Sequence, residues 1–512
     1  MGHMFVRQKK NKSGKVSVQV IAKARGSYRV MKTVGCSDDA NEISNLVFEA
    51  QQFIPGLSGQ LPLGWETAFD KSIDKYFDSF DNTQINNIGP ELILGAIFDK
   101  IGFNVFPDEL FRHLVIARLV YPGSKLKTLD YLQRHKNITV SPSGIYRFLD
   151  KLHSRYKDKI ETVSFAHTKK ILNGNIAVVF YDMTTLYFEI EDEDDLRKIG
   201  FSKDGKFQQP QIMIGLLVGE NGYPIGYDIF KGNTFEGHTL LPVLQSLCKK
   251  HNLPKPIVVA DAGLMSKENI ENLKNNGYTF IVGARIKNES NNVKKEILCK
   301  AENMRDGDGF KFEKSDGSFL VITYSDRRAR KDKHNREKGL KRLAEQVKTG
   351  KLSKQHINSR GYNRFLKMAG RVEIMIDEEK VAADKKWDGL KGYVTNADLS
   401  IETIVKRYTQ LWQVEKAFRI SKTDLRVRPI FHQLEKRIEA HICIAFASYA
   451  VFKELERQLQ MHKAGMSAAR AIELLQNMYQ ITYTLPDSKK RKTKLLKMDN
   501  NQRILFEMIS QK

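Results

Sequence analysis

Cysteine is scarce in this chain, and apolar runs long enough to span a membrane are absent. The four cysteines, Cys36, Cys248, Cys299 and Cys443, are scattered without a C-x-x-C pair. Their spacing argues against a zinc site and a disulfide framework and favours a reducing cytosol. The longest apolar stretch, residues 442–452, is too short to cross a bilayer and predicts a buried helix. The first residues lack the apolar core of a signal peptide, so we expect a cytoplasmic protein without a membrane partner.

Acidic residues are outnumbered by basic ones. The 512 residues include 84 Lys and Arg against 60 Asp and Glu, a net charge of +24. This excess favours a polyanionic partner, of which nucleic acid is the obvious one. Hydrophobic residues make up 41% of the chain, so we expect large packed cores in about three or four domains. We find no internal repeats.

The N-terminal third divides into a β-rich and a helical part. We interpret residues 1–4 as a tag remnant and the start of the chain. Residues 5–55 alternate as three short strands before a helix, which predicts a small β domain. This domain is either a DNA-contacting arm or a cap packed on its neighbour. Residues 56–172 form a predicted helical DNA-binding region, in which two helices separated by a short turn resemble a helix-turn-helix.

The second of those helices carries Arg147 and Lys151, which are candidate DNA contacts. A plain helical hairpin is the alternative, because many such hairpins share this pattern. The two readings stay open at this level.

The middle of the chain has an α/β pattern. Strands are predicted at 176–182, 185–190, 211–218, 224–230, 257–261 and 279–284, and helices at 239–251 and 267–276. This order favours a mixed sheet flanked by helices. We assign 173–286 and 393–460 to one core, 287–392 to a β-rich insertion between its halves, and 461–512 to a C-terminal helix and basic tail. The charged run at 327–343 fits either a solvated helix face or a surface along phosphates.

Three acidic residues lie in contexts that suggest chemistry. Asp182 lies in AVVFYDMTT (177–185). Asp261 follows the apolar residues of PIVVADAG (256–263), and Glu415 lies in the helical RYTQLWQVEKAFRISK (407–422). A carboxylate in an apolar strand is costly unless it sits at a strand end or has a partner, so we predict strand-to-loop positions for both aspartates. Each alone also fits a turn-capping residue. Together the three can converge on two Mg²⁺ ions, which clamp the oxygens of a phosphodiester.

The predicted helix around Glu415 has a polar stripe. Tyr408 and Lys422 lie seven residues before and after Glu415, and in a regular helix such spacing leaves each within roughly 20° of the same line. Arg419 lies one turn further on. Arg419 and Lys422 can hold phosphates, whereas the alternative is an amphipathic helix with ordinary ion pairs.

These motifs resemble a known family. The stripe Tyr408…Glu415…Lys422, with WQVEKAFR inside it, is similar to the tyrosine–arginine–glutamate–lysine signature of one branch of bacterial insertion-sequence DDE transposases. The segments FYDMTT and VADAGL around Asp182 and Asp261 resemble the first and second acidic motifs of that family. The resemblance covers roughly 170–460. It has one departure, because Leu411 stands where the signature has arginine, and Arg407 or Arg419 is a candidate replacement.

The resemblance implies an α/β fold with an RNase H-like core and a catalytic, metal-binding triad of Asp182, Asp261 and Glu415. Two Mg²⁺ ions would be held there, with Mn²⁺ as a substitute. Tyr408 and Trp387 join the expected DNA contacts, and Trp387 would stack on a flipped base in a hairpin route. The alternative for Trp387 is a core residue. His432 and His441 are interpreted as helix-packing residues.

The implied function is cut-and-paste DNA transposition. The protein would bind terminal inverted repeats, act as an endonuclease at the ends, and join the 3′-OH ends to target DNA. The expected partners are double-stranded DNA and a second copy of the chain in a synaptic homodimer, in the bacterial cytoplasm at the nucleoid. The alternatives are an RNase H-like nuclease without strand transfer and a catalytically inactive DNA-binding derivative.

Overall fold

The computed structural model describes residues 3–24, 26–57, 68–78, 80–81, 84–190, 192–202, 205, 208–263, 266–349, 352, 354–358, 361–369, 373–428, 430–485 and 488–510. The chain divides into two compact units. The first comprises Met1–Gln84 and Tyr483–Lys492, and the second Ile85–Thr482 and Thr493–Lys512. This division falls after residue 84, whereas the sequence placed a boundary after residue 55.

The first unit is a small antiparallel sheet with a helix. Its elements are β1 (His3–Lys10), β2 (Val16–Ala24), β3 (Ser27–Ser37), α1 (Ala40–Leu57) and α2 (Ala68–Phe77). The strand order β1-β2-β3 confirms the predicted three-stranded sheet. Val18, Val20 and Ala50 form its small core. His3, assigned above to a tag remnant, pairs with Lys23 as the first residue of β1.

The second unit is built on an eight-stranded mixed sheet of order β10-β11-β14-β9-β8-β5-β6-β7. Its strands are β5 (Val178–Tyr187), β6 (Gln211–Val218), β7 (Pro224–Lys231), β8 (Ile257–Ala260), β9 (Thr279–Ala284), β10 (Gly309–Glu313), β11 (Phe319–Tyr324) and β14 (Leu390–Thr395). Strands β5, β6 and β7 are antiparallel, and β8 and β9 continue parallel to β5. This arrangement is the RNase H-like mixed sheet that the resemblance implied, so the predicted fold class is confirmed.

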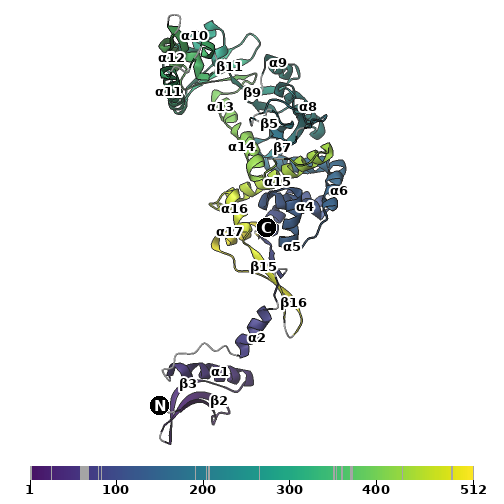
Figure 1. Ribbon diagram of the computed structural model, residues 1–512, viewed down its shortest axis with the longest axis vertical. Coiled ribbons are helices and arrows are strands. Elements are labelled where there is room, and N and C mark those ends of the chain that lie inside the picture. The colour runs from purple at the N-terminus through teal and green to yellow at the C-terminus, as the bar shows by residue number, and fades with distance from the viewer. Residues whose placement is uncertain are drawn as a thin grey trace. The chain divides into compact units, whose positions relative to one another are not determined.

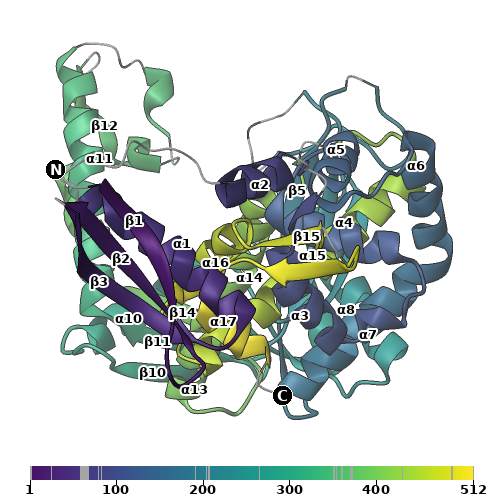
Figure 2. The ribbon, with the colours of Figure 1, turned by 90° about the horizontal axis from the view of Figure 1, so that it is seen from below.

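The helices of the second unit lie on both faces of this sheet and beyond it. They are α3 (Ala96–Ile101), α4 (Glu109–Val120), α5 (Lys125–Lys136), α6 (Pro142–Lys151), α7 (Lys157–Ile171), α8 (Leu240–His251), α9 (Lys267–Asn275), α10 (Asn291–Ala301), α11 (Asp326–Lys348), α12 (Glu378–Lys385), α13 (Ile401–Thr409), α14 (Trp412–Arg419), α15 (Glu435–Met461), α16 (Ala468–Leu475) and α17 (Asn500–Ser510). In Figure 1 and Figure 2, α13 lies beside the outer strands of the sheet, in agreement with its contact with β10. No helix among the described residues is long and apolar enough to cross a membrane.

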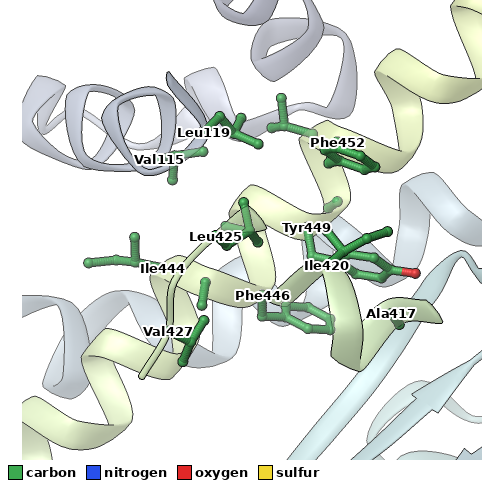
Figure 3. Close-up of a cluster of buried hydrophobic side chains, with 14 of the residues drawn as sticks. Val115, Leu119, Ala417, Ile420, Leu425, Val427, Ile444, Phe446, Tyr449 and Phe452 are labelled. Atoms are coloured by element: carbon green, nitrogen blue, oxygen red, sulfur yellow. The ribbon is translucent and has the colours of Figure 1, made fainter. Parts of the chain in front are cut away.

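The long helix α15 lies at the centre of the largest hydrophobic core, as its apolar sequence predicted. It packs against α4, α6 and α7 and against β7. Figure 3 shows Phe446 and Phe452 of α15 together with Val115 and Leu119 of α4 and with Ala417 of α14. A single core therefore joins the helical region to one face of the sheet.

Three local features differ from the sequence prediction. Strand β5 is continuous, where two strands were predicted, because it pairs with β6 from its third residue to its last, from Phe180↔Val218 to Tyr187↔Gln211. The predicted insertion at 287–392 is not wholly separate, since β10, β11 and β14 extend the main sheet. Its remaining part is α11, α12 and the hairpin β12 (Leu366–Ala369)–β13 (Glu373–Ile376), around a small core of its own.

The predicted basic tail is instead a hairpin followed by a helix. Strand β15 (Tyr479–Thr484) pairs with β16 (Arg491–Leu495) and with β4 (Ile85–Asn87), and α17 follows. Strand β16 is polar on both faces, because its sequence RKTKL has three basic residues and one threonine before Leu495.

Candidate active site

Two of the predicted acidic residues lie side by side. Strands β5 and β8 are parallel neighbours, and the last pair in their register is Tyr181↔Ala260. Asp182 and Asp261 are therefore the next residues on two strands that run about 4.8 Å apart. Asp182 was predicted at a strand end, yet it lies inside β5. It is open on one side because β8 ends one position earlier.

Both aspartates belong to the sheet face that α13 and α14 cover. Side chains alternate between faces along a strand, and Phe180 and Val259, two residues before each aspartate, lie in the core that contains α13 and α14. Helix α13 contacts β8 and β9, and α14 contacts β5 and β6. The sheet and this helix pair thus bring the acidic motifs and the signature segment to one place, in the upper part of Figure 1 around β5 and α14.

Tyr408 makes the contact that joins the signature segment to an acidic motif. Its hydroxyl donates to Oδ1 of Asp261 at 3.2 Å. Burial raises the pKa of Tyr408, and the negative charges of Asp261 and Glu415 raise it further, so the phenol keeps its proton. Gly283 on β9 leaves the space for it, because a Cβ there would lie 2.6 Å from the Tyr408 hydroxyl.

A cationic side chain, Lys391 on β14, lies next to this contact. Its Nζ is 4.3 Å from the centre of the Tyr408 ring. Burial and the charge of Arg328 lower its pKa, while Asp261 and Glu415 act in the opposite direction. Glu415 itself is exposed on α14, and its influence on both Tyr408 and Lys391 places it near the same site.

A cavity of about 700 Å³, called here the candidate-site cavity, lies next to the contact between Tyr408 and Asp261. Asp261, Tyr408, Lys391 and Trp387 line it together with basic residues that include Arg285 and Arg328. Trp387, the predicted stacking residue, therefore shares a cavity with a predicted catalytic aspartate.

The turn that carries Trp387 is held to α11 by a buried ion pair. Arg336 is 5% exposed and contacts both carboxylate oxygens of Asp388, with Nη2–Oδ2 at 2.6 Å. Asp384, at the end of α12, is a further acidic neighbour of Arg336, at 3.9 Å. Several cations of the charged helix α11 instead remain exposed, among them Arg330, Lys338 and Lys341.

The signature segment is not the single regular helix that the spacing argument assumed. Helix α13 ends at Thr409, and α14 begins at Trp412. Hydrogen bonds from Leu411 N to Tyr408 O and from Val414 N to Leu411 O tighten the junction into a 3₁₀-like turn. A π-helical turn, Ile420–Asp424, then follows α14. The predicted common line through Tyr408, Glu415 and Lys422 is therefore wrong, because the helical phase changes twice along it.

The structure separates the remaining signature residues. Leu411 is buried in the main core, which explains an apolar residue at the position of the signature arginine. Arg419 is exposed, and Lys422 borders a different, apolar crevice beside Phe418. Arg407 is half-buried, and its Nη1 has no hydrogen-bond partner among the described residues.

The two helical-region candidates have different surroundings. Arg147 is exposed on α6, whereas Lys151 forms an ion pair with Asp108 at 2.9 Å. Ser141 caps α6 by accepting from the Gly144 amide, and Pro142 opens the helix. A helix, a short turn and a second helix are therefore present at the predicted place.

The donor chemistry of the aspartate pair fits a divalent cation. Adjacent carboxylates supply the hard oxygen ligands that Mg²⁺ and Mn²⁺ take. Among the residues that the structure describes, however, no three His, Cys, Asp or Glu side chains form a group that could hold a metal ion. The fold therefore assembles Asp182 and Asp261 and leaves Glu415 outside a three-carboxylate cluster.

Lys391, Gly283 and Arg328 were missed from sequence. Lys391 lies on β14, which pairs with β11 and β9, and Gly283 lies on β9. These long-range pairings set the place of both residues, and no local motif marks them. The alternation in Leu390–Thr395 was the available signal, since it puts Lys391 on the same face as Tyr393, whose ring packs edge-on against Tyr408 at 4.9 Å.

Comparison with known proteins gives one match to a family. Residues 175–451, more than half of the chain, match the family model described as a transposase DDE domain. No curated protein matches the chain. Among solved structures, the chain is similar to a piggyBac transposase seen by cryo-EM in a synaptic complex with hairpin DNA. The identity is 12%, 76% of each chain is covered, and the TM-score is 0.36.

Proposed function

We propose, from the premise that this chain belongs to the transposase DDE domain family, that it is the cut-and-paste transposase of a bacterial insertion sequence. It would bind the terminal inverted repeats as a synaptic homodimer at the nucleoid. It would cleave the ends and join them to target DNA. The observation that carries the proposal is the adjacent pair Asp182 and Asp261, with Tyr408 bonded to Asp261 at the edge of a basic cavity.

The proposed roles follow from position. Asp182, Asp261 and Glu415 would hold two Mg²⁺ ions, with α14 moving Glu415 towards the aspartates. When bound, such ions stabilise the charge on the attacking and leaving oxygens of a phosphodiester. Tyr408 orients Asp261 by donating to one of its oxygens. That hydrogen bond leaves the other carboxylate oxygen of Asp261 as a ligand.

The proposed reaction has two stages. Water adds to the phosphorus at the transposon end, the P–O3′ bond breaks, and the departing oxygen takes a proton to become a free 3′-OH. This 3′-OH then attacks a phosphodiester, in the opposite strand for a hairpin route or in the target, and displaces another 3′ oxygen. Trp387 would stack on an extruded base, an interaction worth about 1–3 kcal/mol, and exposed cations of α11 would lie along phosphates.

The experiment uses a labelled duplex from the end of the encoding element, with Mg²⁺ or with chelator. We expect wild type to cleave only with metal. Asp182→Asn, Asp261→Asn and Glu415→Gln should each slow cleavage more than about 100-fold while binding persists. Glu296→Gln serves as the control, because the Glu296 side chain is exposed and its ion pair is with Lys300, one turn further along α10.

The outcomes separate the candidate functions. Cleavage followed by joining to a target plasmid supports a transposase. Cleavage without joining would indicate a nuclease of the same fold. Specific binding with no cleavage in Mg²⁺ or Mn²⁺ would overturn the catalytic proposal and leave a DNA-binding derivative.

Lys391 is the proposed replacement for the signature arginine. It lies on Tyr408 beside Asp261 and has no ion pair with a carboxylate among the described residues. We expect Lys391→Met to slow end cleavage and to reduce the salt slope of DNA binding by about 0.9, the loss of one phosphate contact. Lys391→Arg should restore both, and Lys300→Met should change neither. Normal cleavage by Lys391→Met would refute this role for Lys391, but it would not contradict the proposed roles of Asp182 and Asp261.

A further inference from the structure

A second cavity lies away from the acidic residues, at the start of α5. It has a volume of about 460 Å³ and is called here the α5 cavity. It opens between the segment before α5, the loop before α15 and α15 itself. Its basic lining residues are Arg118, Lys125, Lys127, Arg426, Arg428, His432 and His441. All of its lining residues are among those described, and no acidic side chain is among them.

Two of the cations in the α5 cavity are buried without a counter-ion. Lys125 is 5% exposed and Arg118 4% exposed. The Nη1 of Arg118 donates to backbone carbonyls of Gly123 at 3.1 Å and Arg426 at 3.3 Å. The Lys125 ammonium reaches only Nδ1 of His441, at 3.5 Å. Within the described part of the chain, neither cation pairs with a carboxylate.

The histidines cannot supply the missing negative charge. His441 Nε2 lies 3.0 Å from the carbonyl of Val427, so this nitrogen carries the proton and donates. Nδ1 of the neutral ring is then the acceptor that faces Lys125. Burial lowers the pKa of His432 to about 3, and the charges of Lys125, Arg118 and Arg437 act in the same direction. The electrostatic environment of the cavity is thus positive on every side that the structure describes.

Burying charges in this way is costly. Burial and the charge of Arg118 lower the pKa of Lys125 well below its usual value, and a buried amine keeps its proton best beside an opposite charge. Asp150 is the acidic residue of α6. It already forms ion pairs with Arg437 at 2.9 Å and with Lys436 at 3.3 Å. The α5 cavity therefore has the composition of a site whose counter-ion is a ligand.

The backbone adds to this positive environment. Helix α5 begins at Lys125, and Ser124 caps it by accepting from the Lys127 amide. The first turn of the 12-residue helix faces the cavity through Ser124, Lys125 and Leu126. Free amides and the helix dipole at such an end favour a phosphate, in the same place as the buried ammonium.

We propose that the α5 cavity is a phosphate-binding site, in which Lys125, Arg118 and the first turn of α5 hold one phosphate group. Its source, on the basis of the proposed function, is a backbone phosphate of the bound transposon end, delivered beside the helix pair α5–α6. Free inorganic phosphate has the same chemistry. The volume lies within the range of about 300–1,000 Å³ usual for ligand sites, which accommodates a phosphate with its flanking sugars.

The site also gives a role to one of the residues that the sequence interpreted as helix packing. His432 and His441 do pack between the loop and α15, and their rings lie 5.5 Å apart. Nδ1 of His441 at the same time faces the Lys125 ammonium at 3.5 Å. The ring contacts of His432 within the described residues are with His441 and Tyr146. His441 is therefore the positioning residue for Lys125, and the phosphate would contact Lys125 and Arg118.

The test compares the full-length protein with Lys125→Met, which keeps the length of the side chain and removes its charge. The matched control is Lys453→Met, because Lys453 is also 5% exposed but has Glu456 as its partner. In the first arm, thermal unfolding is followed against inorganic phosphate at constant ionic strength in chloride. In the second arm, binding to the transposon-end duplex is measured against salt.

We expect phosphate to raise the unfolding midpoint of wild type and of Lys453→Met. The apparent phosphate affinity of Lys125→Met should fall by about tenfold or more. Without phosphate, Lys125→Met should unfold no earlier than wild type, because an uncompensated buried charge has been removed. In the DNA arm, its salt slope should fall by about 0.9, and that of Lys453→Met should not change.

The arms distinguish the possible failures. A phosphate response lost in Lys125→Met with an unchanged salt slope would keep the site and overturn the DNA backbone as its source. No phosphate response in wild type, together with an unchanged slope in Lys125→Met, would overturn the proposal. A wild type that binds no transposon end would refute the proposed function, while the phosphate arm would still decide the site.

Discussion

At the scale of single residues, the hydroxyl of Tyr408 reaches Asp261 because β9 has no side chain at Gly283. The space is tight, since a Cβ at Gly283 would also lie 3.3 Å from Cβ of Ala262. Ala262 and its backbone follow Asp261 directly, so the methyl group has little room to displace anything except the tyrosine ring. The absence of a Cβ at Gly283 therefore allows the position of Tyr408. Through its hydrogen bond, that position sets the orientation of Asp261.

This arrangement predicts that Tyr408→Phe and Gly283→Ala weaken the same contact. Each should reduce end cleavage, and Tyr408→Phe should lower the free energy of unfolding by about 1 kcal/mol. In a double-mutant cycle, Gly283→Ala should add little once Phe replaces Tyr408, because the hydroxyl that its methyl group would strike is gone. Additive losses in cleavage would show that the two residues act independently. Tyr121→Phe, at an exposed ring on the helical region, is the control.

At the scale of elements, how well the sequence predicts the structure depends on how local the determining interactions are. Continuous apolar runs located the strands that bear Asp182 and Asp261, and the apolar run at 442–452 located α15. The junction at Gln410–Leu411 was not predicted, because no Gly or Pro marks it in the sequence and the break satisfies tertiary packing. Leu411 enters the main core only when the turn tightens.

The extension of the main sheet was equally hidden from a local reading. Strand β14 joins β9 in antiparallel register from Gly392↔Ala284 to Thr395↔Ile281, across more than a hundred residues of intervening chain. Such pairing is set by packing against other strands and has no local signal. For the site, the acidic motifs were visible in sequence, whereas Lys391 becomes part of it only through this pairing.

At the scale of elements, the ion pair between Arg336 and Asp388 attaches α11 to the turn that carries Trp387. Arg336→Met should leave Asp388 unpaired and destabilise α11 by on the order of 3 kcal/mol. Hydrogen exchange should accelerate in the amides of α11 and not in β5 or β8. Lys333→Met is the matched control on the same helix, because Lys333 is 67% exposed and 4.0 Å from Glu337, a pair worth less than about 1 kcal/mol. Equal acceleration in both variants would contradict this role for Arg336.

At the scale of the whole second unit, α15 connects the helical region to the main sheet. The buried Lys453 and Glu454 of this helix form ion pairs. Glu454 is 1% exposed. It accepts from Arg457 at 2.7 Å and contacts His167 of α7 at 3.2 Å. Burial alone would raise the pKa of Glu454, but the hydrogen bonds from Arg457, His167 and Gln458 outweigh it and lower the pKa to about 2. A carboxylate at the centre of the unit therefore stays ionised in acid.

This lowered pKa predicts an acid-dependent loss of stability. Because the folded pKa lies below the ordinary value of 4.5, the unfolded state binds the proton more readily, and the contribution is present above pH 4.5 and lost as pH falls towards 2. Its size is on the order of 3 kcal/mol. In urea unfolding, the deficit of Glu454→Gln relative to wild type should be largest at pH 6 and should shrink steadily below pH 4.5, whereas Glu473→Gln, whose side chain is 65% exposed, should follow wild type throughout. A deficit that stayed constant down to pH 3 would mean that Glu454 stabilises the unit through packing and neutral hydrogen bonds, and that α15 connects helical region and sheet without help from its charge.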